Sequence, residues 1–242
     1  MAAEKINPND YLFMKEHTLS SLRKYLAEYV DSDLLVNYQM AADKKGLPNL
    51  LLSCYRAVER MDKEKILVNP LYKDEGQIFT RAQMLKSGPI HFSWSISVMS
   101  SLLERGDISL QEFKVSELMP YVSTDMLKSK IMADPQINPD PIYVIQYIYQ
   151  DQQWAVDGNH RVAKLHRQNP SNIVAGYLFP SRIHMEAIVL NFMQVAYAIV
   201  YNVNAAVDYS FEAGEKGEFP ETLPQLLHMD GFSKKGVGLF AR

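Results

Sequence analysis

The chain has almost no cysteine, no strong charge of either sign and no apolar stretch at its start. A single cysteine among 242 residues excludes an internal disulfide and a cluster of cysteine ligands around a metal. The formal net charge of −3 argues against electrostatic binding of nucleic acid by the whole surface, although it does not exclude a local basic patch. Because residues 1–8 lack the apolar core of a secretory signal, we expect a cytoplasmic protein in which Cys54 is a buried, reduced thiol.

A long hydrophobic run without polar interruptions is also missing. The most apolar segment, residues 185–203, approaches the length of a membrane span, but it contains a glutamate, two asparagines and a glutamine. We therefore predict a buried helix of a globular protein there and no membrane partner.

The first 110 residues read as mostly helical. Apolar residues spaced by three and four predict a helix over 18–30, and Pro48 fits the start of a second helix over 48–62. We expect a third helix to begin at Phe79, with Thr80 as its cap, and a fourth to cover 92–105.

The pattern changes after Asp107 to short strands alternating with short helices. The expected order is a strand from Phe113, a helix over 124–133, strands over 142–149 and 154–156, a helix over 160–168 and a strand over 173–179. We expect one short helix in the tail, at 223–227. The sequence thus predicts an α+β protein with segments 1–110, 111–182 and 183–242 packed together as one unit.

The most informative residues lie between the strand that ends at Val156 and the helix over 160–168. They form a polar turn, Asp157-Gly-Asn-His-Arg161, at the point where free backbone N–H groups and the positive end of the helix dipole gather. A cationic pair at this point, His160 and Arg161, opposes the dipole. The opposition is understandable if an anion such as phosphate lies between them.

This turn resembles the Asp-Gly-X-His-Arg signature of the ParB/sulfiredoxin-like superfamily. The surrounding order is similar too: a Leu-X-Pro element at Leu118–Pro120, a short helix, a Pro-Ile-X-Val strand at Pro141–Val144, the motif and a closing strand. The resemblance covers about residues 115–179 and implies a small mixed-sheet domain that binds ATP or CTP together with Mg²⁺.

The resemblance also implies roles for individual residues. Gly158 would let the backbone approach a phosphate, and His160 and Arg161 would contact phosphate oxygens. Asn159 belongs to the same phosphate-binding turn. Asp157 would order the turn or help to hold Mg²⁺, so that Asp157, His160 and Arg161 are the candidate catalytic residues. Lys128 and Lys130 would add phosphate contacts from the preceding helix, although a solvated helix face explains them as well. The sequence identifies no set of metal ligands.

The chain departs from the better-known members of the superfamily. Sulfiredoxins need a cysteine where this chain has Asn159, and partition proteins usually carry an arginine where it has His160. We therefore expect a nucleotide hydrolase or a small-molecule phosphotransferase. The alternatives are a nucleic-acid-associated module, either a nuclease or a partition-like accessory protein, and a regulatory protein without catalysis. A homodimer is left open.

Overall fold

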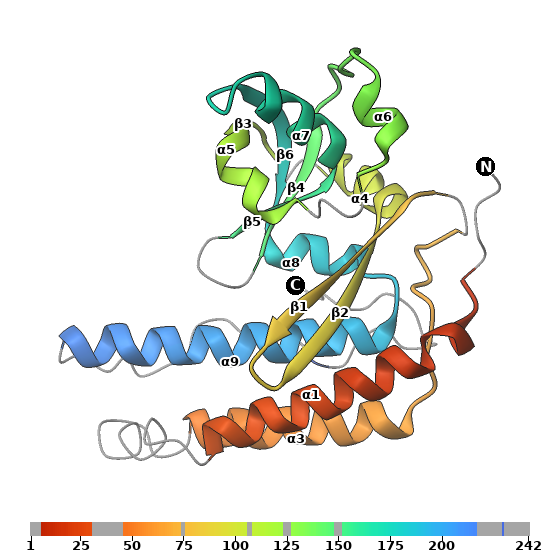
Figure 1. The fold of residues 1–242 in the computed structure, drawn as a ribbon. Coiled ribbons are helices and arrows are strands. Elements are labelled where there is room, and N and C mark those ends of the chain that lie inside the picture. Colours follow the sequence, from red (N-terminus) through yellow and green to blue (C-terminus); the bar gives the residue numbers. More distant parts are fainter. Residues whose placement is uncertain are drawn as a thin grey trace. The chain divides into compact units, whose positions relative to one another are not determined.

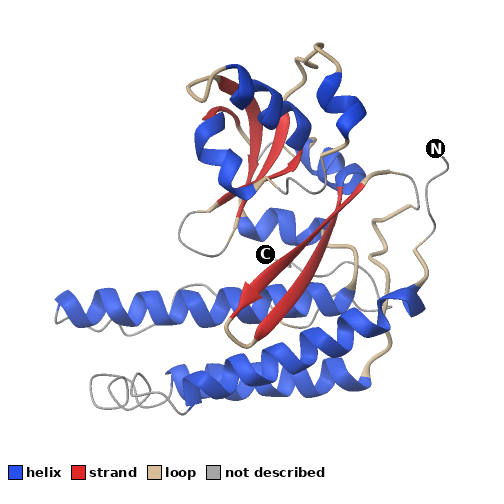
Figure 2. Ribbon diagram, in the orientation of Figure 1, coloured by secondary structure: helices blue, strands red, loops and turns tan. Residues whose placement is uncertain are grey.

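The computed structural model describes residues 6–30, 46–73, 76–105, 108–122, 127–147, 152–216 and 229. These residues form helices and two small β-sheets, so the α+β class is confirmed (Figures 1 and 2). The chain divides into two compact units. Unit 1 comprises Met1–Glu75, Thr80–Ser93 and Ile188–Arg242, and unit 2 comprises Gly76–Phe79 and Trp94–Ala187. Unit 1 thus combines residues from both ends of the sequence.

The described part of unit 1 is built on long helices. The long helices are α1 (Leu12–Val30), α3 (Gly46–Lys63) and α9 (Asn191–Lys216). The short helix η1 (Pro8–Tyr11) precedes α1. Helix α1 packs on α3, and α3 packs on α9 (Figure 1). Helix α1 begins six residues before the predicted start at Thr18, which lies buried inside the helix.

A β-hairpin replaces the helix predicted from Phe79 and the first four residues of the helix predicted over 92–105. Strand β1 covers Ile78–Leu85 and pairs with β2, Gly88–Ser95 (Figure 2). The apolar side chains of β2 alternate and are fully buried, at Ile90, Phe92 and Trp94. Helix α4 follows over Ile96–Leu103, and its first turn is capped by Ser95, whose Oγ accepts from the Val98 N–H at 3.3 Å.

The most apolar segment is buried, as predicted, but it is not one helix. In unit 2, helices α8 (Ser181–His184) and η4 (Met185–Ala187) precede the unit boundary, and α9 begins after it at Asn191. The Asn191 side chain accepts from the Leu67 N–H at 2.9 Å and donates to the Lys65 carbonyl at 3.1 Å, which explains a polar residue in this run. Among the helices in the described ranges, none is long and apolar enough to cross a membrane. The short helix expected near 223–227 lies outside the described residues.

Unit 2 is organised around a four-stranded sheet with the order β3-β6-β4-β5. The strands are β3 (Leu110–Lys114), β4 (Ile142–Gln146), β5 (Gln153–Asp157) and β6 (Ile173–Phe179). The central pair, β4 and β6, is parallel, and the two outer pairings are antiparallel. The predicted strands at 154–156 and 173–179 are therefore confirmed.

Short helices in unit 2 carry the residues of the candidate site. They are α5 (Val115–Leu118), η2 (Met119–Tyr121), α6 (Ser129–Ala133) and α7 (Asn159–Gln168). Helix α7 contacts α5, α6 and η2, and its Val162 lies in a core with Leu118, Ile142 and Val144. The predicted helix over 124–133 is shorter than expected, because Lys128 is extended and helix geometry begins at Ser129; residues 123–126 lie outside the described ranges.

Candidate functional site

Gly158 fixes the turn between β5 and α7. Its φ of 84° and ψ of 16° place it in the left-handed region, which side chains other than hydrogen disfavour. A Cβ atom at this position would also run into the Ile142 side chain, where it would lie 2.9 Å from Ile142 Cβ. Glycine is thus required twice over, by backbone geometry and by the close approach of β4.

The N-terminus of α7 has no side-chain cap. The first helical hydrogen bond within α7 runs from the Val162 N–H to the Gly158 carbonyl at 3.0 Å. The N–H groups of the first turn, at residues 159–161, therefore lack partners within the helix, as such groups do in any α-helix. These donors and the positive end of the dipole favour an anion at this end of α7.

His160 lies in this first turn but is not the cation that the sequence suggested. Its Nε2 accepts from the backbone N–H of Lys128 at 2.8 Å, so the proton of the ring lies on Nδ1. Burial, followed by the nearby charges of Lys128 and Lys164, lowers the pKa of His160. The predicted cationic pair is therefore one cation, Arg161, beside a neutral imidazole that keeps one N–H to donate.

The guanidinium of Arg161 has a hydrogen-bond partner at a terminal nitrogen but none at Nε. One terminal nitrogen donates to the backbone carbonyl of Asp140. The Nε atom is buried and has no hydrogen-bond partner among the described residues. Neither Arg161 nor His160 pairs with a carboxylate in the part of the chain that the structure describes. A buried donor without an acceptor is costly, so this guanidinium is a candidate for an incoming oxygen atom.

The other predicted site residues occupy different positions around the turn. The Asn159 side chain donates to the Ala155 carbonyl at 3.0 Å, which ties it to β5. Asp157 is partly exposed at the end of β5, where it lies opposite Tyr143, and its carboxylate has no hydrogen bond or ion pair with any described residue. Lys128 and Lys130 are exposed at and just inside the start of α6.

Side chains of helix α7 hold the segment 127–140 through the backbone atoms of that segment. Besides the two contacts from His160 and Arg161, Lys164 Nζ donates to the Gln136 carbonyl at 2.8 Å. All three contacts use main-chain atoms of the segment, which contains Pro135 and Pro139 and has little regular structure beyond α6. The residues predicted to bind phosphate thus also position this segment beside α7.

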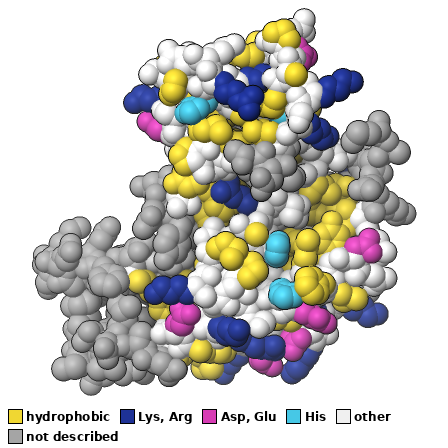
Figure 3. Space-filling model, viewed as in Figure 1, with side chains coloured by type: hydrophobic (Ala, Val, Ile, Leu, Met, Phe, Trp, Pro, Cys, Tyr) yellow, Lys and Arg dark blue, Asp and Glu magenta, His cyan; other side chains and the backbone are white. Residues whose placement is uncertain are grey.

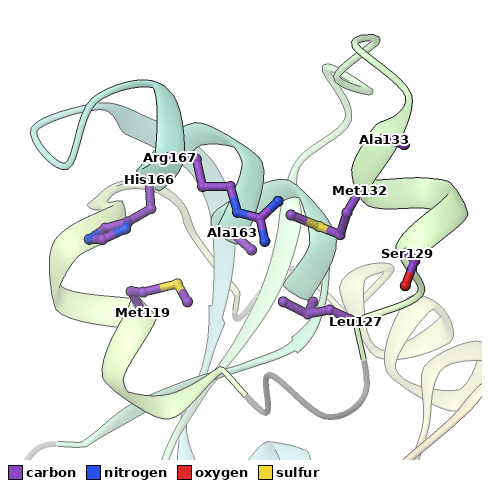
Figure 4. A pocket seen from close by; sticks show the side chains of 8 residues that line it. All are labelled: Met119, Leu127, Ser129, Met132, Ala133, Ala163, His166 and Arg167. Carbon is purple, nitrogen blue, oxygen red and sulfur yellow. The ribbon is translucent and has the colours of Figure 1, made fainter.

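A pocket of about 400 Å³ lies between this segment, η2 and α7 (Figure 4). The residues that line it are Met119, Leu127, Ser129, Met132, Ala133, Ala163, His166 and Arg167. In Figure 4 the Arg167 side chain extends from α7 across the pocket toward Met132, and His166 turns toward Met119. Ala163 follows His160 by three residues, so the pocket begins about one helical turn from the N-terminus of α7.

Sequence reasoning did not place His166 and Arg167 beside an apolar pocket. The available signal was their position in the last turn of α7, next to Ala163, whose small side chain leaves room against the helix. Their pairing with Met119 and Met132 depends on tertiary packing, which periodicity does not reveal.

Within the described ranges, no group of three or more histidine, cysteine, aspartate or glutamate residues is placed to hold a metal ion. A scan against protein-family models returned no match for this chain, and searches of curated proteins and of solved structures returned none either.

Proposed function

We propose that this chain is a ParB/sulfiredoxin-like protein that binds ATP or CTP with its phosphates at the N-terminus of α7. The single observation that carries the proposal is Arg161, a cation placed against the helix dipole with a buried, unpartnered Nε. Gly158 supports it, because its positive φ and the close approach of Ile142 leave the turn that begins α7 without a side chain. The order of η2, α6, β4, α7 and β6 matches the order of elements on which the resemblance rests.

The residues of the turn suit hydrolysis of a nucleotide or transfer of its phosphoryl group. Arg161 would neutralise phosphate charge, the N–H groups of residues 159–161 would donate to phosphate oxygens, and His160 would donate from Nδ1. Asp157 fits Mg²⁺, because Mg²⁺ in nucleotide sites is commonly held by one or two carboxylates, by phosphates and by water. When bound, Mg²⁺ would neutralise charge on the phosphates.

Isothermal titration with ATP, CTP, GTP and ADP in the presence of Mg²⁺ tests this proposal. We expect one of them to bind the unmodified chain, and Arg161→Gln to weaken binding roughly tenfold or more, because a charged hydrogen bond is lost. Arg56→Gln is the matched control, since Arg56 is an exposed arginine on α3. Its affinity should be unchanged.

Thermal melting without nucleotide separates binding from folding. Arg161→Gln should melt within a few degrees of the unmodified chain, because it removes one partly exposed contact to Asp140. The proposal would be contradicted if none of the four nucleotides gave a heat of binding at about millimolar concentration, which lies above the dissociation constant of most nucleotide sites.

A second candidate function, a nucleic-acid-associated module, is favoured by the basic side chains around α6 and α7. Lys128, Lys130, Lys164 and Arg167 lie on these two helices or immediately beside them. Figure 3 shows Lys and Arg side chains over this part of unit 2. A mobility-shift assay at rising salt tests it, because binding through phosphate contacts must weaken steeply with salt. An affinity that does not change with salt concentration, or an absence of binding at low salt, would rule out this second candidate function.

A further inference from the structure

The pocket beside α7 combines apolar walls with the cationic side chain of Arg167. Its apolar lining comes from Met119, Leu127, Met132, Ala133 and Ala163. The guanidinium of Arg167 has no hydrogen bond or ion pair with any residue in the described ranges, and no aspartate or glutamate is among the lining residues. We propose that this pocket binds a small organic acid whose apolar body lies between α6 and α7 and whose carboxylate pairs with Arg167.

The walls suit an apolar body of modest size. A volume of about 400 Å³ falls within the usual range for small-molecule sites, which are mostly apolar with a few polar groups. Met119 and Met132 face the pocket from η2 and α6, on opposite sides of Ala163 in Figure 4. Methionine side chains adapt their shape and make favourable sulfur contacts with aromatic rings, so a ring or a short chain fits between them.

The polar groups suit one anion. Arginine presents a planar set of donors that matches both oxygens of a carboxylate. His166 and Ser129 lie in the same lining and offer further donors at its edge. An anion in this pocket would meet Arg167 without competition from a carboxylate of the lining residues.

A nucleobase suits the same lining less well. A base has several ring donors and acceptors, and the apolar residues of the pocket would leave most of them without partners. The residues proposed to hold phosphates, His160 and Arg161, are not among the lining residues. The acid site therefore does not depend on nucleotide binding, and the two proposals can fail separately.

Methyl NMR with the probe 3-phenylpropionate tests the acid site. The chain is labelled at its methionine methyl groups, and the signals of Met119 and Met132 are assigned by Met→Leu variants. We expect both signals to shift, with a dissociation constant of about 1 mM for a ligand of roughly eleven non-hydrogen atoms. Met84 in β1 is the control, because it is 69% exposed and belongs to unit 1, so its signal should stay in place.

The uncharged analogue 3-phenylpropanamide separates charge recognition from apolar contact. It should bind roughly tenfold more weakly than the acid, because it cannot form the charged hydrogen bonds to Arg167. Arg167→Gln should remove this difference, and Arg56→Gln should preserve it. Arg167 is exposed, so the variant is expected to fold, and the unperturbed methyl spectrum without ligand checks this.

Three results would overturn the acid site. One is an absence of shifts at about 10 mM acid, which lies well above the expected dissociation constant. Another is equal binding of acid and amide. The third is displacement of 3-phenylpropionate by ATP together with the same shifts at Met119 and Met132, which would assign the pocket to the nucleotide. Loss of ATP binding in Arg161→Gln with unchanged acid binding would support both proposals.

Discussion

Two basic side chains, one in each unit, meet backbone carbonyls in opposite electrostatic settings. In unit 1, Lys15 of α1 donates to the carbonyls of Asp62 and Glu64, at 3.2 and 2.6 Å, where α3 ends. A cation at a helix C-terminus complements the dipole. In unit 2, Arg161 donates to the Asp140 carbonyl from the first turn of α7, where a cation opposes the dipole.

The difference separates a structural cation from a functional candidate. Lys15 is 8% exposed, and its charged end has two carbonyl partners at a helix end that favours it, so packing and hydrogen bonding explain it fully. Burial is the main reason that its pKa is lowered. Arg161 has one carbonyl partner, an unsatisfied Nε and an unfavourable dipole. A residue whose local surroundings do not explain it is the better candidate for a ligand contact.

The largest effect is expected from Gly158→Ala. The substitution introduces strain at positive φ and a clash with Ile142, and it should lower the free energy of unfolding by about 2–4 kcal/mol. Gly88→Ala in unit 1 is the matched control: φ is also positive, but the new Cβ meets Ser21 Oγ, the end of a small side chain. Urea unfolding measures both. Equal losses would show that the α7 turn is no more constrained than the hairpin.

A buried histidine extends the comparison to a fully satisfied group in unit 2. His184 is completely buried; Trp94 Nε1 donates to its Nδ1 at 3.1 Å, and its Nε2 lies 3.2 Å from the Gln146 carbonyl. Burial lowers the pKa of His184 to about 3. As the pH falls below about 6.5, His184 binds a proton in the unfolded state but stays neutral in the folded state. The free energy of unfolding therefore falls by roughly 1.4 kcal/mol per pH unit.

Urea unfolding at several pH values between about 7 and 5, on either side of the ordinary histidine pKa, checks the contribution of His184. His184→Gln has no ring to protonate, so its stability should fall less steeply over this range than that of the unmodified chain. Identical slopes would mean that other groups account for the whole pH dependence.

Lys15→Met should have a smaller effect than Gly158→Ala. Methionine keeps much of the buried stem but removes the charged donor from two carbonyls, so we expect a loss of about 1–3 kcal/mol. Lys24→Met on the same helix is the control, because Lys24 is exposed. A loss no greater than in the control would remove the structural explanation of Lys15.

The smallest effect on stability is expected from Arg161→Met. The variant loses the contact with Asp140, but it also removes a cation from the wrong end of α7 and a buried donor without a partner. The free energy of unfolding should therefore change by less than about 1 kcal/mol, as measured by urea unfolding without ligand. A loss as large as that of Lys15→Met would mean that Arg161 is structural too.

The sequence predicted the part of the fold in which local preference and tertiary packing agree. Strand β6 was predicted over Ile173–Phe179, and α7 began one residue before its predicted start, because β-branched residues and a glycine turn mark these elements clearly. The β1–β2 hairpin was missed. Residues such as Ala82, Gln83 and Met84 favour helix locally, which explains the wrong prediction in β1. In β2 the alternating apolar residues Ile90, Phe92 and Trp94 are a strand signal that the prediction overlooked.

The candidate site was predicted as a set of residues and not as a set of contacts. The turn and its glycine follow from sequence, since positive φ and a strand-to-helix connection favour glycine. The neutral state of His160 and the ties from α7 to residues 128, 136 and 140 arise between segments about 20 to 30 positions apart. Such contacts leave no periodic trace in the chain.

The way in which α7 holds the segment 127–140 has a consequence for how this protein can change. The anchors on the segment are one amide hydrogen and two carbonyl oxygens, which every residue except proline can supply at 128 and every residue at 136 and 140. Side chains along this wall of the pocket are therefore free to diverge between relatives without detaching it. Under the proposed acid site, substitutions on the wall would change ligand preference while the helix that faces it stays the same.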